Sequence, residues 1–126
     1  MKGHRDLLVW QKSMRHVTEV YETTKAYPKD EIFGLVSQMR RAAVSIPSNI
    51  AEGYGRSYDK ETYKFLSNAL GSASELETQW LLSKELGFID GVTANAMTER
   101  IAEIIRMLSS LIKTLNVNFQ SKTTEA

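Results

Sequence analysis

The sequence has no cysteine, only two prolines and seven glycines, and no long hydrophobic run. The lack of cysteine excludes disulfide bridges, thiolate metal sites and a cysteine nucleophile. So few prolines and glycines disfavour an all-β sandwich or barrel, which needs a turn about every ten residues. The longest early apolar run, 7–10, is too short for a secretory signal or a membrane span. We therefore expect a cytoplasmic protein that does not bind membranes.

A strong excess of charge of either sign is also missing. The 126 residues include 16 Lys and Arg against 15 Asp and Glu, a formal net charge of +1. The molecule as a whole therefore gives no electrostatic indication of a polyanionic partner. The length fits one domain. We place this domain at residues 1–115 and expect the polar tail, residues 116–126, to fray.

Apolar residues recur at helical spacing in four segments. The first predicted helix spans about 7–26, with Asp6 as its N-cap. The second begins near Asp30 and ends near Gly53, and its apolar pattern continues through Pro47. Because proline removes one backbone hydrogen bond, we predict one helix kinked at Pro47, with two short helices as the alternative. The first apolar stripe consists of Leu7, Trp10, Met14, Val17, Tyr21 and Thr24.

Start and stop signals delimit the other two helices. Asp59 or Ser57 is placed to cap a third helix that reaches about Leu86, and Gly87 is placed to end it. Asp90 is the expected N-cap of the fourth. The fourth helix carries a heptad pattern of Met97, Ile101, Ile104, Leu108, Leu111 and Leu115, widened by Ile105 and Ile112. Four amphipathic helices with short connections predict an all-α, antiparallel up-down-up-down four-helix bundle.

Small side chains gather on the second and third predicted helices, where they would let two helix backbones approach closely. They include Ala42, Ala43, Ser45, Ser48, Ala51 and Gly53 on one helix, and Ala69, Gly71, Ser72 and Ala73 on the other. If the chain folds back around Ser57, Ala42 and Ala43 lie near Gly71 and Ser72. This register places Arg41 near Glu75, which predicts a partly buried ion pair. Asn49 and Glu52 lie beside the carbonyl freed at Pro47 and could satisfy it or each other.

A long motif lies in these two helices. It reads Gln38-x-Arg40-Arg41-Ala42-Ala43-x-Ser45-Ile46-Pro47-Ser48-Asn49-Ile50-Ala51-Glu52-Gly53, and continues in Phe65-Leu66-x-x-Ala69-x-Gly71-Ser72-x-x-Glu75-Leu76-Glu77 and Leu86-Gly87-Phe88-Ile89. Over about residues 5–115, the chain resembles the four-helix-bundle proteins of the 23S rRNA-intervening sequence family. The resemblance implies a bacterial antiparallel bundle that assembles into homopentameric rings, with no established molecular activity.

The patterns typical of catalytic and metal sites are missing. The residue three before His16 is Ser13, so the Glu-x-x-His motif of di-iron bundles does not occur there. We expect His16 to be a surface or partly packed side chain. The loop 53–57 lacks the Gly-Lys-Ser/Thr ending of a phosphate-binding loop. We therefore predict no enzyme activity, no cofactor and no metal.

Basic and aromatic residues alternate around the predicted turn between the second and third helices. Arg56, Lys60 and Lys64 are interleaved there with Tyr54, Tyr58 and Tyr63. Cationic groups bind phosphates, and tyrosine rings stack on unpaired bases. Because Glu52, Asp59 and Glu61 lie in the same region, a polar hairpin end is the first interpretation of this turn, and a nucleic-acid patch is the alternative. Arg5, Lys12 and Arg15 are interpreted first as a solvated face of the first helix, with a second basic stripe as the alternative.

Two functions remain open from the sequence. The first is a non-enzymatic homo-oligomeric bundle, a pentamer by the family resemblance, that binds RNA or another nucleic acid through its summed basic patches. The alternative is a ring-shaped scaffold that docks a partner protein and has no affinity for nucleic acid.

Overall fold

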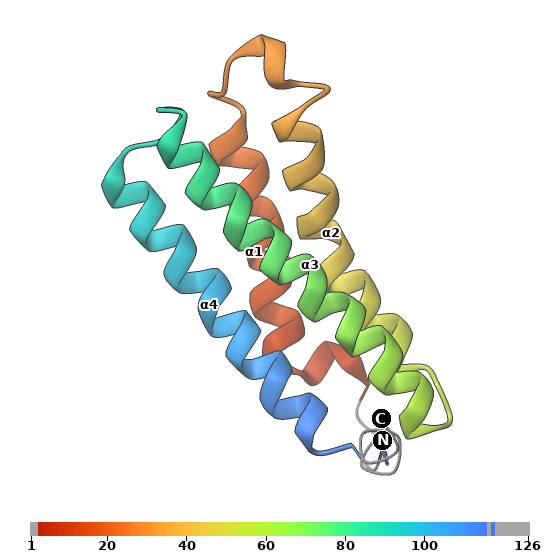
Figure 1. Ribbon diagram of the computed structural model, residues 1–126. Coiled ribbons are helices and arrows are strands. Elements are labelled where there is room, and N and C mark those ends of the chain that lie inside the picture. Colours follow the sequence, from red (N-terminus) through yellow and green to blue (C-terminus); the bar gives the residue numbers. More distant parts are fainter. Residues whose placement is uncertain (1–2, 116, 118–126) are drawn as a thin grey trace, which may run out of the picture.

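Four α-helices make up most of the described chain, which in the computed structural model comprises residues 3–115 and 117 (Figure 1). They are α1 (Leu8–Thr24), α2 (Leu35–Tyr54), α3 (Asp59–Glu85) and α4 (Gly91–Lys113), preceded by the short 3-10 turns η1 (His4–Asp6) and, before α2, η2 (Lys29–Glu31). No strand occurs among the described residues. The predicted all-α four-helix fold is therefore confirmed. The predicted tail, 116–126, lies outside the described residues except for Val117.

Successive helices run in opposite directions (Figure 1). On α3, the Thr62 hydroxyl donates to the carbonyl of Gly53 over 2.9 Å, and the Ser72 hydroxyl donates to the hydroxyl oxygen of Ser45 over 2.8 Å. Residue numbers thus rise along α3 as they fall along α2, the relation expected of antiparallel neighbours. Within the described residues, none of the helices combines the length and apolar content that a membrane crossing requires.

The core fills the space between the four helices. Its largest fully buried side chains include Met39, Ile46 and Ile50 of α2, Leu66, Leu76 and Trp80 of α3, and Ile101, Ile104 and Leu108 of α4. Each buried aliphatic side chain contributes about 1.5–3 kcal/mol relative to an exposed one. The heptad predicted on α4 is confirmed, because its first four members are buried and Leu111 and Leu115 pack against the core.

The buried face of α1 differs from the predicted apolar stripe. Of that stripe, Thr24 is buried and Leu7, Trp10 and Val17 pack against the core, whereas Met14 and Tyr21 are exposed. The fully buried face consists of Val9, Ser13, His16, Val20 and Thr24. The polar members are buried because their hydrogen bonds are satisfied internally. The Ser13 hydroxyl donates to the Trp10 carbonyl over 2.9 Å, and the Thr24 hydroxyl donates to the Val20 carbonyl over 2.7 Å.

The predicted N-caps are wrong for α1 and α3 and right for α4. Asp6 lies inside η1, so Leu7 occupies the cap position of α1. Tyr58, rather than Asp59 or Ser57, occupies the cap position of α3. The start predicted near Asp30 for the second helix is also wrong, since Asp30 lies inside η2 and α2 begins at Leu35. Only Asp90 makes the expected side-chain bond. Its carboxylate accepts the Thr93 N–H over 2.7 Å, and this bond lowers the pKa of Asp90.

The turn that ends α3 follows the prediction. Gly87 has φ of +77°, a left-handed conformation that favours glycine. Its N–H donates to the Lys84 carbonyl, and the N–H of Phe88 donates to the Ser83 carbonyl, which is the hydrogen-bond pattern of a Schellman motif. The Phe88 ring packs against Tyr27, with ring centroids 5.2 Å apart. This contact joins the α3–α4 turn to the segment that follows α1.

Helix α2 continues through Pro47, which excludes two helices separated at that residue. The predicted kink stays a prediction. Pro47 cannot donate to the carbonyl of Ala43, four residues before it. The expectation that Asn49 or Glu52 satisfies this carbonyl is wrong. The Asn49 amide donates to the Ser45 carbonyl and hydroxyl at 2.8 and 2.9 Å, and Glu52 binds Arg56.

Two glycines of the small-residue motif lie in contrasting surroundings. A Cβ at Gly53 would lie 3.1 Å from the Phe65 Cβ, whereas one at Gly71 would meet no atom within 4 Å. We expect Gly53→Ala to lower the free energy of unfolding by about 1–2 kcal/mol, because α2 and α3 must move apart. Gly71→Ala should raise it by about 0.5–1 kcal/mol through helix propensity. Urea unfolding of both variants measures the difference, and equal effects would contradict close packing at Gly53.

Candidate nucleic-acid interface

The turn between α2 and α3 is held by packing and by one hydrogen bond. Gly53 packs against Phe65, and the Thr62 hydroxyl binds the Gly53 carbonyl. This fixes the last turn of α2 against the first turns of α3. Residues 55–58 therefore form a short connection at one end of the bundle (Figure 1). The five residues predicted to bind nucleic acid lie on this connection or within two turns of it.

Arg56 is held in place by two contacts. Its guanidinium donates to the Glu52 carboxylate over 2.6 Å and lies over the Phe65 ring, 4.8 Å from the ring centroid. The ammonium of Lys64 lies 5.7 Å from the same centroid. Phe65 thus orients two of the three predicted cations through cation–π attraction. The predicted set of site residues did not include Phe65, although Phe65 lies next to Lys64 and is part of the family motif.

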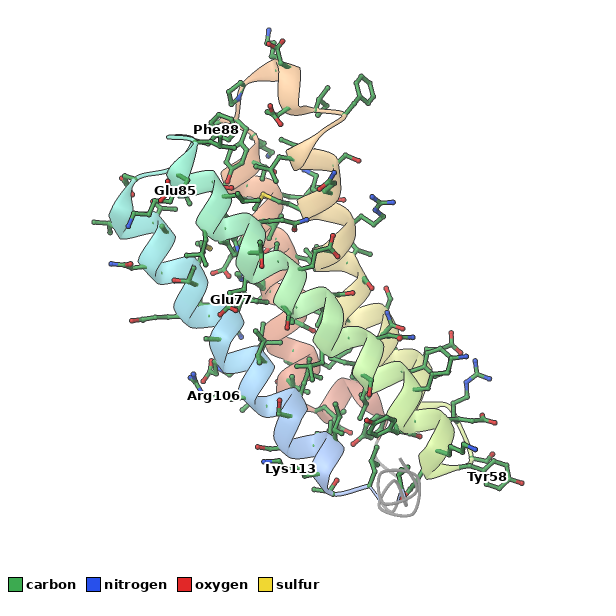
Figure 2. All side chains as sticks on the ribbon, in the orientation of Figure 1. Tyr58, Glu77, Glu85, Phe88, Arg106 and Lys113 are labelled. Carbon is green, nitrogen blue, oxygen red and sulfur yellow. The ribbon has the colours of Figure 1, made fainter. Side chains whose placement is uncertain are left out.

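The remaining predicted residues are accessible. Tyr58 is 69% exposed and Tyr54 is 38% exposed, and the partial burial of Tyr54 raises the pKa of its hydroxyl. Lys60 is exposed and forms no ion pair among the described residues. Figure 2 shows Tyr58 projecting outward from the end of the bundle. The structure therefore brings together two accessible rings and three cations, as the sequence pattern predicts.

Other helix termini add positive charge to this end. Lys113 of α4 lies at the same end of the bundle as Tyr58, opposite the end that carries Glu85 and Phe88 (Figure 2). The 3-10 turn η1 packs against α2 and carries the exposed Arg5. Carboxylates of Glu52, Asp59 and Glu61 offset part of this charge. The surface is thus a mixed one, in which Arg56 already neutralises Glu52.

The second predicted basic stripe is not a continuous free surface. Lys12 forms an ion pair with Glu103 of α4 over 3.1 Å. Arg15 is exposed on α1, while Arg5 belongs to η1 and not to the helix. The pairing of Lys12 across two helices makes it part of the contact between α1 and α4. We therefore leave this stripe out of the candidate interface.

The predicted pair between Arg41 and Glu75 is not formed. Both side chains are exposed rather than partly buried, and the ion pairs of the described residues do not include theirs. Glu75 instead accepts a hydrogen bond from Gln79 over 3.2 Å. α2 and α3 do contact each other three to four residues from this pair, where the Ser72 hydroxyl binds the Ser45 hydroxyl, so the predicted register is nearly right. The long side chains of Arg41 and Glu75 are nevertheless exposed to solvent.

His16 is buried, contrary to the expectation of a surface or partly packed side chain. It is 2% exposed, and its Nε2 accepts the indole N–H of Trp80 over 3.0 Å. Its Nδ1 lies 2.8 Å from a Glu19 carboxylate oxygen, and Glu19 also pairs with Arg100 of α4. Burial lowers the pKa of His16. The neutral ring, with its proton on Nδ1, therefore links α1, α3 and α4.

No group of three or more potential metal-binding side chains occurs among the described residues. His16 itself has both nitrogens engaged in the contacts above. These observations fit a structural role for His16.

Comparison with known proteins supplies the remaining findings. Residues 5–110 match the sequence model of a family described as 23S rRNA-intervening sequence protein. Among solved structures, a similar one is that of a protein with unknown function from the S23 ribosomal protein family of Bacteroides thetaiotaomicron VPI-5482. The two share 24% sequence identity with a TM-score of 0.76, over 84% of this chain and 99% of that chain, which shows a common fold. The curated proteins include no match.

Proposed function

Because the chain belongs to the 23S rRNA-intervening sequence protein family, we propose that it is a non-enzymatic, homo-oligomeric bundle that binds RNA. The observation that carries this proposal is the accessible group of Arg56, Lys60, Lys64, Tyr54 and Tyr58 at one end of the bundle. Ribosomal RNA is the nucleic acid that the family description suggests. The pentameric state is part of the proposal and comes from the family resemblance.

Each group in this surface has a separate role in the proposed binding. Lys60 and Lys64 lie one helical turn apart, so their ammonium groups can contact successive phosphates. Tyr58 offers a ring on which an unpaired base stacks, and stacking contributes about 1–3 kcal/mol per base. Arg56, oriented by Phe65, adds a planar donor for a phosphate. A single copy has few contacts, and several copies in one assembly raise the avidity without new contacts.

Salt dependence tests this function. Three phosphate contacts on single-stranded RNA predict a slope of about −2 for the logarithm of the binding constant against that of salt concentration. Affinity for a labelled single-stranded fragment of 23S rRNA should therefore fall at least about tenfold between about 50 and 200 mM salt. Fluorescence anisotropy measures the binding, and light scattering on the same sample gives the oligomeric state.

Two results would contradict the proposal. Absence of binding at the lower salt concentration would favour a scaffold that docks a partner protein. A purely monomeric species would remove the oligomer from the proposal.

A further inference from the structure

A groove on the outer face of α1 and α2 has no part in the proposed function. It has a volume of about 620 Å³, and its lining includes Tyr21, Ile32, Phe33, Arg40, Arg41 and Val44. Phe33 precedes α2, whereas Arg56 follows it, so the groove begins at the opposite end of α2 from the candidate RNA surface (Figure 1).

The groove exposes an unusual amount of apolar side chain. Phe33 is 93% exposed, and Ile32 and Val44 are 47% and 41% exposed. A single exposed apolar residue is ordinary, but several that line one groove mark an interaction surface. The groove follows α2 from Val36 to Ser45, a rise of about 14 Å or between two and three helical turns. This length matches a short helix laid along the groove.

The charge of the groove has one sign. Its lining contains two arginines and no acidic side chain. Arg40 is fixed, because its Nε donates to the Thr24 hydroxyl over 3.1 Å and its guanidinium lies 4.6 Å from the centroid of the Tyr21 ring. Arg41 is exposed and forms no ion pair within residues 3–115. Positive groups beside an apolar floor are complementary to carboxylates that flank an apolar stripe.

The same contacts disfavour a nucleic acid in this groove. Arg40 lies over one face of the Tyr21 ring, so that face is not open to a base. The side chains of Ile32 and Val44 are aliphatic and provide no stacking surface, which leaves the exposed ring of Phe33 as the main place in the lining for a base to stack. Apolar anchors spaced three or four residues apart on a helix fit such a floor better than bases do.

We propose that this groove binds an acidic amphipathic helix of a partner protein, with apolar anchors toward Phe33 and Val44 and carboxylates toward Arg40 and Arg41. This site is separate from the RNA surface and does not rest on the proposed RNA binding. Either can fail without affecting the other.

A peptide titration tests the groove. The probe is a labelled synthetic helix of about fifteen residues, with leucines at positions i, i+4 and i+7 and flanking glutamates, and the full chain is titrated against it. We expect saturable binding that Phe33→Ser and Arg41→Glu each weaken by about tenfold or more. Val92→Ser, which removes a residue 82% exposed at the start of α4, is the matched control and should leave the affinity unchanged.

Several outcomes would overturn the proposal. One is no binding of the acidic peptide, and another is equal binding of a version with lysine in place of every glutamate. A change in oligomeric mass caused by Phe33→Ser would assign the groove to a second copy of this chain. Loss of RNA affinity in Phe33→Ser would assign it to nucleic acid. Because both altered side chains are exposed, circular dichroism should show an unchanged fold.

Discussion

A chain that carries Arg56→Glu, Lys60→Glu and Lys64→Glu should lose RNA affinity by a factor of about 100 or more. The three changes replace every predicted phosphate-binding cation with a carboxylate, which repels phosphate and releases no counterion. Arg56→Glu also places a second carboxylate one turn from Glu52 and removes the cation over Phe65. The stability cost should be small, because all three positions are exposed. Anisotropy with the 23S rRNA fragment measures the loss.

A variant at the opposite end of the bundle is the matched control. Lys25→Glu, Lys29→Glu and Lys84→Glu produce the same change in net charge at exposed positions near the α1–α2 and α3–α4 connections. This chain should keep most of its affinity. Equal losses in the two triple variants would mean that RNA responds to net charge and not to the proposed surface. Undiminished binding by the first variant would show that the surface is assigned wrongly.

Trp80→Ala should lower the free energy of unfolding by about 3–5 kcal/mol, a large part of the stability of a small domain. The Trp80 side chain has no exposed surface, so its removal leaves a cavity between helices. It also removes the N–H that satisfies Nε2 of the buried His16. Urea unfolding followed by circular dichroism measures the change without relying on tryptophan fluorescence.

Two further variants separate packing from hydrogen bonding at this position. Trp80→Phe keeps an aromatic ring but leaves the His16 Nε2 unpaired, which should cost about 1–3 kcal/mol beyond the lost volume. Adding His16→Leu to Trp80→Phe removes both polar partners and should recover part of this loss. A Trp80→Phe variant as stable as the unmodified chain would show that the bond between the two rings contributes nothing.

Helical spacing was sufficient to predict the fold class, and it predicted α4 best. Met97, Ile101, Ile104 and Leu108 are all buried, as the heptad indicates. Asp90 and Gly87 could also be predicted, because each acts through local backbone geometry. These features depend on residues close in sequence, for which capping rules and helical periodicity are sufficient.

The face of α1 could not be predicted in this way, because its burial depends on distant partners. Ser13 and His16 are polar, so the sequence alone gives no reason to expect them in the core. His16 is nevertheless buried, where it accepts a hydrogen bond from Trp80, 64 positions away in the sequence. The candidate RNA surface was predicted as a set of residues, but the role of Phe65 depends on where Arg56 folds back over it. The ion pair of Lys12 could not be predicted either, because its partner Glu103 lies on another helix, far away in the sequence.

The bond between His16 and Trp80 has a consequence for how the chain selects one topology. In a competing arrangement with α1 displaced by one turn along its neighbours α2 and α4, aliphatic contacts could be exchanged at small cost. Such a displacement would, however, leave the indole N–H of Trp80 and the Nε2 of His16 buried without hydrogen-bond partners. The polar pair thus discriminates against mispaired bundles, and the gap that separates the native arrangement from its competitors depends on it.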